Sequence, residues 1–258
     1  GMQFATIPEA IEELKAGRMI VVVDDPDREN EGDLIMAGEM CTADAMNFMV
    51  KFGRGVPFIP TTAERLVELG IPMMTKQNTA RLGTAMGETV DALHGTTTGV
   101  SAYDRAKTVQ VFIDENAKPS DLGRPGHIIP LRAEKGGVLR RAGHTEATVD
   151  LCRMAGKFPS GVLCEIVTED KSEMARLEEL KVFATKHNMP IISIADLIRY
   201  RRQHEKLVRH VSQAVIPTDG GEYTAHVYES VLDSEQHLAF VYGDIDGATD
   251  LLVRVHSE

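Results

Sequence analysis

The pattern of apolar and polar positions predicts helices and strands that alternate irregularly along the first two hundred residues. Helical spacing of apolar residues, with caps such as Thr42 and Ser101, predicts helices at 8–17, 43–52, 62–70, 102–112, 145–155, 174–187 and 195–202. Short runs rich in β-branched residues predict strands at 19–23, 128–131, 161–168 and 191–194. Residues 71–100 lack periodicity, and 119–127 have the Pro and Gly content of a long turn. This order predicts an α+β protein, an α/β sandwich on a mixed sheet.

The last fifty residues have a different character. Patterns at 223–228, 238–242 and 251–255 predict a short antiparallel β tail. From residue 207 onward the chain has nine acidic residues and only two basic ones. This shift in composition predicts domains at 1–206 and 207–258. Three strands alone are marginally stable. The tail is therefore expected to pack on the main domain or a partner subunit, or to begin a longer domain.

Composition narrows the class of protein. The chain has 258 residues, 43% of them hydrophobic, which is enough to bury a sizeable core. It lacks an apolar run of about 20 residues and a signal peptide at its start, so a cytoplasmic location is expected. The net charge of −11 disfavours nucleic acid and anionic membranes as partners. Three cysteines without a Cys-x-x-Cys pair are expected to be reduced thiols.

An acidic turn follows the first predicted strand. Residues 24–33 read Asp-Asp-Pro-Asp-Arg-Glu-Asn-Glu-Gly-Asp and hold six carboxylates and one arginine. Carboxylates this close repel one another unless a cation offsets their charge, so the turn is typical of a site for a hard metal ion. A calcium-binding EF-hand is disfavoured, because Gly38 stands where a bidentate glutamate is required and a strand precedes the loop. A solvated surface turn is the open alternative.

A second cluster precedes the helix predicted at 145–155. Residues 140–146 read Arg-Arg-Ala-Gly-His-Thr-Glu. Unpaired N–H groups at a helix start and two adjacent arginines can hold a phosphate, and His144 can offer an imidazole to a metal. In the alternative interpretation, Thr145 and Glu146 are merely favourable helix-start residues and the arginines are solvated.

Five motifs in order resemble the 3,4-dihydroxy-2-butanone 4-phosphate synthase family over about residues 3–205. They are Asp24–Asp33, Thr97–Arg105, Arg124–His127, Gly143–Ala147 and Gly161–Glu165. The resemblance implies an α/β sandwich fold and a homodimer with active sites near the subunit interface. It also implies Mg²⁺ or Mn²⁺ as the only cofactor.

The resemblance further implies a metal-dependent carbon–carbon lyase of riboflavin biosynthesis. Such an enzyme converts the sugar phosphate D-ribulose 5-phosphate into 3,4-dihydroxy-2-butanone 4-phosphate and formate. By resemblance, Glu29 and His144 hold the metal, and His127 and Glu165 are the catalytic residues. The residues implied to bind substrate are Arg28, Glu29, Asp33, Arg141, Ala142, Gly143, His144, Thr145 and Glu165, with the phosphate at 141–145. Proton removal beside a ketose carbonyl requires both charge stabilisation and groups that move protons.

Three residues depart from the family pattern. Phe58 stands where a cysteine is usual, Leu82 where an aromatic residue is common, and Gly87 within a Thr-x-Phe-Thr-like stretch. They keep open the alternative of a catalytically weakened paralogue that binds metal and sugar phosphate and acts as a regulatory or scaffolding partner.

The tail resembles the start of a GTP cyclohydrolase II domain. The similarity lies at residues 215–218 and 252–258. The zinc-binding cysteines of such a domain are expected beyond Glu258, so the tail by itself is not expected to hydrolyse GTP.

Overall fold

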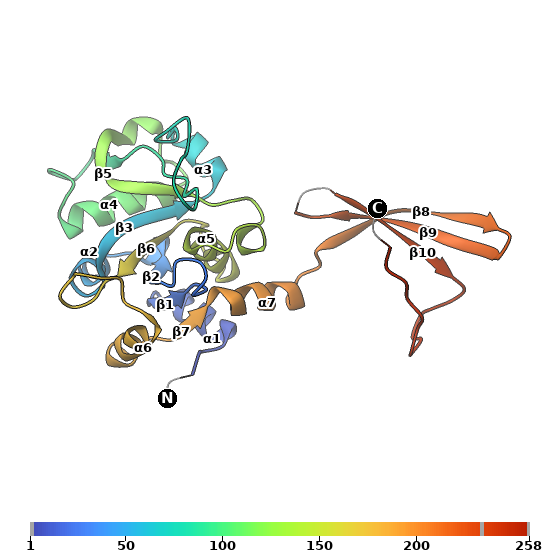
Figure 1. The fold of residues 1–258 in the computed structure, drawn as a ribbon. Coiled ribbons are helices and arrows are strands. Elements are labelled where there is room, and N and C mark those ends of the chain that lie inside the picture. The colour runs from blue at the N-terminus through green and yellow to red at the C-terminus, as the bar shows by residue number, and fades with distance from the viewer. Residues whose placement is uncertain (1–2, 233–234, 257–258) are drawn as a thin grey trace. The chain divides into compact units, whose positions relative to one another are not determined.

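The protein contains two sheets in two compact units. The computed structural model describes residues 3–232 and 235–256, and the chain divides into Gly1–Arg201 and Arg202–Glu258 (Figure 1). The first unit holds a seven-stranded sheet and the second a three-stranded one. The predicted fold class, an α/β sandwich on a mixed sheet with an antiparallel β tail, is confirmed.

The large sheet is mixed in strand direction. Its strands lie in the order β4 (Val90–Ala92), β5 (Leu122–Arg132), β3 (Arg54–Thr61), β6 (Gly161–Ile166), β2 (Gly32–Ala37), β1 (Ile20–Val23) and β7 (Ile191–Ser193). The pairs β1–β7 and β3–β5 are parallel, and the other neighbours are antiparallel. Strands distant in sequence, such as β2 and β6, therefore lie side by side.

Helices cover both faces of this sheet. One face packs against α2 (Ala43–Phe48), α3 (Ala63–Glu68), α4 (Ala102–Ile113) and α6 (Leu177–Lys186), and the other against α1 (Ile7–Lys15), α5 (His144–Met154) and α7 (Ile194–His204). Short 3₁₀ helices span Gly38–Met40, Pro119–Asp121 and Gly137–Leu139, and a π-helical turn spans Met49–Gly53. On β1, Val21 and Val23 join one core and Ile20 and Val22 the other, as the two-residue period of a strand requires.

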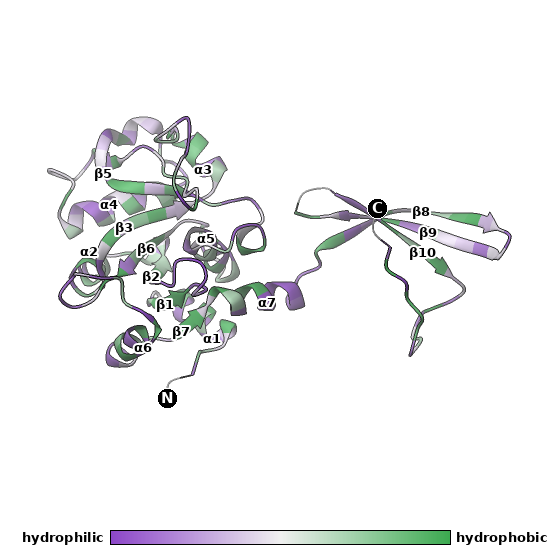
Figure 2. Cartoon of the chain, in the orientation of Figure 1, coloured by the Kyte–Doolittle hydropathy of each residue, from purple (hydrophilic) through white to green (hydrophobic). Residues whose placement is uncertain are grey.

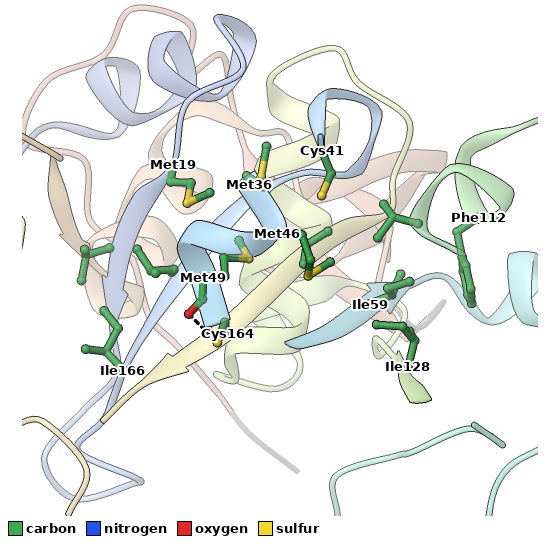
Figure 3. Close-up of a cluster of buried hydrophobic side chains, with 14 of the residues drawn as sticks. Met19, Met36, Cys41, Met46, Met49, Ile59, Phe112, Ile128, Cys164 and Ile166 are labelled. Atoms are coloured by element: carbon green, nitrogen blue, oxygen red, sulfur yellow. Dashed lines mark hydrogen bonds between the residues drawn. The ribbon is translucent and has the colours of Figure 1, made fainter. Parts of the chain in front are cut away.

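Sulfur-containing side chains fill much of the core beneath α2 (Figure 3). Met36, Met46 and Met49 are fully buried there. The thiol of Cys164 donates to the Met49 carbonyl at 3.6 Å. All three cysteines are free and buried, and burial raises the pKa of each thiol to about 12. They act as small hydrophobic residues.

Hydroxyl side chains begin several helices as the sequence predicts. Thr42 Oγ1 accepts from the Ala45 N–H, and Ser101 Oγ accepts from the Asp104 N–H. At the third of these helices Thr62, and not Thr61, is the cap, accepting from Arg65 N–H at 3.0 Å. Such caps satisfy N–H groups that have no partner within the helix.

Three strands of the large sheet have no counterpart in the hydrophobic pattern. β2 is buried along its whole length, so its sequence does not alternate, and β3 contains Gly55, Pro57 and Pro60, which interrupt a strand pattern. β4 is short and lies in the segment 71–100 predicted as loop. The turn predicted at 119–127 is also wrong from residue 122 on, because the Gly- and Pro-rich first half of β5 pairs with β4.

The second unit is an antiparallel meander of β8 (Val208–Thr218), β9 (Gly221–Ser230) and β10 (Gln236–Tyr242). The strand predicted at 251–255 is wrong, and the third strand is instead β8. Every residue of β8 is exposed in this unit, so the alternation that identifies a half-buried strand is missing. Apolar residues are nevertheless frequent on these strands (Figure 2), and Val215, Leu238 and Phe240 are each at least 60% exposed.

Among the helices within residues 3–232 and 235–256, none combines the length and the apolar character needed to cross a bilayer.

Adjacent residues on α3 provide a test of the packing. Leu66 is 2% exposed and Val67 is 79% exposed. Leu66→Ala is expected to lower the free energy of unfolding by about 2–5 kcal/mol, because it leaves a cavity in the core. Val67→Ala is expected to change it by less than about 0.5 kcal/mol. Chemical denaturation of both variants checks this pair, and equal effects would contradict the arrangement of α3.

Candidate active site

Strand register brings two predicted carboxylates together. Asp33 on β2 lies opposite Glu165 on β6 and opposite Val22 on β1. Side chains alternate along a strand, and Ile35 and Leu163 both join the core beneath α5. Asp33 and Glu165 therefore project from the same face of the sheet, toward the layer that contains α5.

The acidic turn between β1 and β2 is organised around Asp24. Its carboxylate is inaccessible to solvent and accepts from the Glu29 N–H and the Glu31 N–H, each at 2.9 Å. Arg28 Nη1 pairs with Asp24 and with the Glu29 carboxylate. Arg176 donates to the Glu29 carbonyl at 3.1 Å and so ties the turn to the start of α6. This network holds the backbone of Glu29 in place within the turn.

His144, the first residue of α5, is oriented by the sheet. It is 5% exposed, and its Nε2 lies 3.0 Å from the Val22 carbonyl oxygen. A carbonyl only accepts, so Nε2 carries the proton and Nδ1 is left with a lone pair. Nδ1 lies 3.9 Å from Asp33 Oδ2. Burial lowers the pKa of His144, which favours the neutral ring that a metal ion requires.

These groups form a set of acceptors without enough donors. Ligand atoms of Asp24, Glu29 and His144 all lie within 4.8 Å of one another. Nearby, Asp33 Oδ1 and Glu165 Oε1 are buried and have no hydrogen-bond partner among the described residues. Buried oxygens without partners carry a large desolvation cost. A divalent cation with a preference for oxygen ligands would offset that cost, so the residues fit a metal such as Mg²⁺.

The shifted pKa values of the carboxyl groups also indicate a crowded, buried acidic site. Burial, reinforced by the neighbouring carboxylates, raises the pKa of Asp33 well above its ordinary range. Burial likewise raises the pKa of Glu165, and burial with a hydrogen bond that protonated Glu31 donates to Glu29 raises the pKa of Glu31 to about 7. Shifts of this kind are frequent at functional sites, where several groups of like charge share a small volume.

Two guanidinium groups converge beside the carboxylates. Gly143 precedes α5, and a Cβ at this position would lie 2.4 Å from Arg141 Nη1 and 3.0 Å from Arg28 Nη2. Glu146 is buried and accepts from Arg141 Nη1 at 2.7 Å, which sets the direction of that arginine. The two arginines and the N-terminus of α5, where Ala142 is exposed and Thr145 buried, offer positive charge to one anionic group.

His127 is separate from this cluster, because none of the contacts among the described residues joins the two. It is on β5, its side chain is 47% exposed, and its ring pairs with Asp91 on β4. Among the described residues it has no recorded contact with the acidic turn or with His144. Glu29, Asp33, Glu165, His144 and the arginines are thus brought together, whereas His127 is held on β5, next to the edge strand β4.

The three departures from the family pattern have ordinary structural surroundings. Phe58 is partly buried and packs against the core beneath α5. The carbonyl of exposed Leu82 accepts from Arg141 Nη2 at 3.2 Å. Gly87 donates to the Pro130 carbonyl at 2.9 Å and so holds its segment against β5. None of these contacts disrupts the carboxylate cluster.

Comparison with known proteins agrees with this geometry. Residues 8–200 match the protein-family model described as 3,4-dihydroxy-2-butanone 4-phosphate synthase. The chain belongs to this synthase family. Residues 209–258 match the model described as GTP cyclohydrolase II. Both resemblances seen in the sequence are therefore confirmed.

Relatives with solved structures have the same fold. A two-domain 3,4-dihydroxy-2-butanone 4-phosphate synthase from A. baumannii is 42% identical, with a TM-score of 0.84 over 93% of this chain and 70% of that one. A 3,4-dihydroxy-2-butanone 4-phosphate synthase in complex with two magnesium ions is 43% identical, with a TM-score of 0.75 over 78% of this chain and 98% of that one. The large unit therefore has the fold of known members of the synthase family.

Curated relatives match the chain along nearly its whole length. The bifunctional riboflavin biosynthesis protein RIBA 1 of Arabidopsis thaliana is 54% identical over 99% of this chain and 47% of its own length. The chain spans between about half and two thirds of the first three curated relatives, at 47%, 62% and 63%.

Some features of the site could not be read from the sequence. Asp24 is part of the acidic motif but was not predicted to lie within reach of a metal, and its two hydrogen bonds to the turn explain its place there. The Val22 carbonyl that orients His144 carries no sequence signal, because any residue supplies a carbonyl. Asp91, the partner of His127, stands in the segment predicted as loop.

The raised pKa of Glu31 predicts a pH dependence of stability. Folded protein binds this proton more tightly than unfolded protein, so metal-free protein should lose stability as the pH rises from 4.5, the ordinary glutamate value, to about 7. Glu31→Gln should flatten this slope, whereas Glu115→Gln, at an exposed position, should leave it unchanged. Denaturant titrations between pH 4.5 and 8 with a chelator check the effect. A slope that Glu31→Gln does not reduce would contradict it.

Proposed function

We propose that this protein converts D-ribulose 5-phosphate into 3,4-dihydroxy-2-butanone 4-phosphate and formate, as a metal-dependent carbon–carbon lyase of riboflavin biosynthesis. One observation carries the proposal: buried oxygens of Asp33 and Glu165, without hydrogen-bond partners in the described part of the chain, lie near an imidazole whose Nδ1 is 3.9 Å from Asp33. Family membership supplies the reaction, and this donor set supports its chemistry. None of the observations favours the alternative, a catalytically weakened paralogue that acts as a regulatory or scaffolding partner.

Glu29 and His144 are the residues proposed to hold the metal ion. Glu29 offers a carboxylate and His144 offers Nδ1. A relative in the same family was solved with two magnesium ions, which supports Mg²⁺, and Mn²⁺ has the same preference for these donors. When bound, a divalent cation would stabilise negative charge that develops on the sugar oxygens. Asp24 keeps the turn in place through its backbone hydrogen bonds.

The arginines and the start of α5 are proposed to bind the phosphate of the substrate. Guanidinium nitrogens of Arg28 and Arg141 both lie close to Gly143, so a phosphate bound beside it would meet both groups. The N–H groups of the first turn of α5 add further donors. A glycine at 143 lets the Arg141 guanidinium lie against the start of α5, because a side chain there would collide with it.

Asp33 and Glu165 are proposed to contact the sugar and move protons. Burial raises the pKa of both groups, which favours the protonated form that can return a proton after the carboxylate has accepted one. His127 is proposed as a further catalytic group. Because it is held apart from the cluster in one chain, a homodimer with sites near the subunit interface is part of this proposal.

The net charge and the free thiols bear on the partners and the location of the protein. The net charge of −11 supports a small anionic substrate held by local arginines in preference to a nucleic-acid or membrane partner. The three free, buried thiols fit the reducing conditions of the cytoplasm.

Two substitutions test the metal ligands. Glu29→Gln and His144→Ala are each expected to lower formate release from ribulose 5-phosphate by about a hundredfold or more, because charge stabilisation is lost. They should also weaken Mg²⁺ binding measured by calorimetry. Asp27→Asn, at an exposed carboxylate in the same turn, is the matched control and should retain both properties.

Chelation separates the possible outcomes. Formate release by the unmodified protein that survives EDTA would refute metal dependence. Absence of formate in the presence of Mg²⁺ would refute the proposed reaction itself. Full activity of Glu29→Gln with normal Mg²⁺ binding would remove this residue from the metal site and leave the reaction in place.

A further inference from the structure

We propose that Arg176, the residue that precedes α6, is a positioning residue that holds the acidic turn so that the Glu29 carboxylate can bind the metal ion. The inference rests on the proposed function, because Glu29 is a metal ligand in that proposal. Arg176 is 147 residues from Glu29 in the sequence and lies outside the five motifs that identify the family.

The guanidinium group of Arg176 binds the backbone of the acidic turn. Its Nη1 donates to the Glu29 carbonyl at 3.1 Å and to the Asn30 carbonyl at 2.6 Å. The carboxylates of Asp24 and Glu29 pair with a different arginine, Arg28. Arg176 therefore constrains the path of the chain at Glu29 without occupying the carboxylate of that residue.

The backbone at this point of the turn requires a restraint. Asn30 has φ +54°, in the left-handed region that residues with a side chain rarely adopt. The buried Asp24 carboxylate holds N–H groups of the turn, those of Glu29 and Glu31. The exposed Arg176 holds carbonyl groups of the same turn. Loss of Arg176 would leave the carbonyl groups of Glu29 and Asn30 without this restraint, while the contacts of Asp24 would remain.

Arg176 is itself held in place by β6 and α6. The Ala175 N–H donates to the carbonyl of Ile166, the last residue of β6, at 3.0 Å. In addition, α6 packs closely on the start of β2, because a Cβ on Gly32 would lie 2.6 Å from Leu180 Cδ1, and Leu180 is 1% exposed. The guanidinium group therefore connects the acidic turn to a packed framework of strand and helix.

Charge and position predict opposite effects of Arg176 on metal binding. A guanidinium group near a cation site repels the cation, so its removal should strengthen metal binding if charge decides. Removal of a contact that positions the turn should weaken metal binding, because Glu29 can then turn away from His144. The direction of the change in affinity therefore distinguishes the two roles.

Arg199 on α7 provides a matched control. Its Nη1 lies 2.7 Å from Asp196 Oδ1, three residues earlier in the same helix, and its side chain is 64% exposed. Arg199 lies outside the proposed machinery. Arg199→Met removes the same charge and the same donors as Arg176→Met, at a position whose ion pair lies within α7.

The test measures Mn²⁺ binding to the full chain through the electron paramagnetic resonance signal of the free ion. Arg176→Met is expected to raise the Kd for Mn²⁺ by about 10–100-fold, the usual effect of losing a group that orients a metal ligand. Arg176→Lys keeps a cation that can donate to carbonyl groups, so it should recover part of this loss. Arg199→Met should change the Kd by less than about twofold, as a surface substitution usually does.

Hydrogen exchange gives a readout that requires neither metal nor turnover. In metal-free protein, the amides of residues 24–33 should exchange at least about tenfold faster in Arg176→Met than in the unmodified protein, because the turn opens more often. Exchange in β1 and α5 should be unchanged. If thermal unfolding shows that Arg176→Met is not folded, Arg176→Lys serves as the informative variant in both measurements.

The outcomes distinguish this inference from the proposed function. A Kd for Mn²⁺ that is unchanged or lower in Arg176→Met would overturn the role of Arg176 and leave the proposed reaction intact. An equal rise of the Kd in Arg199→Met, or faster exchange throughout the large unit in Arg176→Met, would show an effect that is not specific to the turn and would also overturn it. If the unmodified protein neither binds Mn²⁺ nor releases formate, the proposed function is refuted, and exchange in the turn then decides the positioning claim.

Discussion

The large unit depends on one electrostatic constraint, the enclosure of several carboxylates at one end of its sheet. Asp24, Asp33 and Glu165 are buried or partly buried there, and two of their oxygens lack donors among the described residues. Repulsion among such groups lowers the stability of metal-free protein. The fold tolerates this cost because the hydrophobic cores on the two faces of the sheet hold β1, β2 and β6 in register. Packing fixes the positions of charges that would otherwise separate.

The arrangement of charges follows from the order of the strands. β2 lies between β1 and β6, so Asp33 meets the Val22 backbone on one side and Glu165 on the other. α5 packs on the same face and brings His144 to the Val22 carbonyl. A one-residue slip of β2 would turn Asp33 to the opposite face of the sheet and Leu34 toward α5. Core and site are therefore specified by the same register.

Motifs that are continuous in the sequence predicted much of this site. The features that were missed depend on pairing between strands that are distant in the sequence. The acidic turn and the Arg-Ala-Gly-His-Thr segment are continuous in sequence, so their chemistry can be recognised without a fold. Helices with clear caps, such as the one begun by Ser101, were found for the same reason. β2 was missed because a strand buried on both sides does not alternate, β3 because glycine and prolines interrupt its pattern, and β4 because an edge strand of three residues has too little pattern. Asp91 and His127 are 36 residues apart, and only the pairing of β4 with β5 brings them together.

The two halves of the proposed machinery are held in physically different ways. Around Glu29 and His144 the protein concentrates acceptors, so a cation contributes to order, and loss of the cation leaves charges that repel. Beside His127 both oxygens of the Asp91 carboxylate have partners, a backbone N–H and the Nδ1 of the ring, behind glycines that admit no side chain. The first arrangement is sensitive to metal and pH, whereas the carboxylate of the second is paired within the chain. A reaction that requires both charge stabilisation and a proton carrier benefits from this division, because binding of the metal need not disturb the orientation of the histidine.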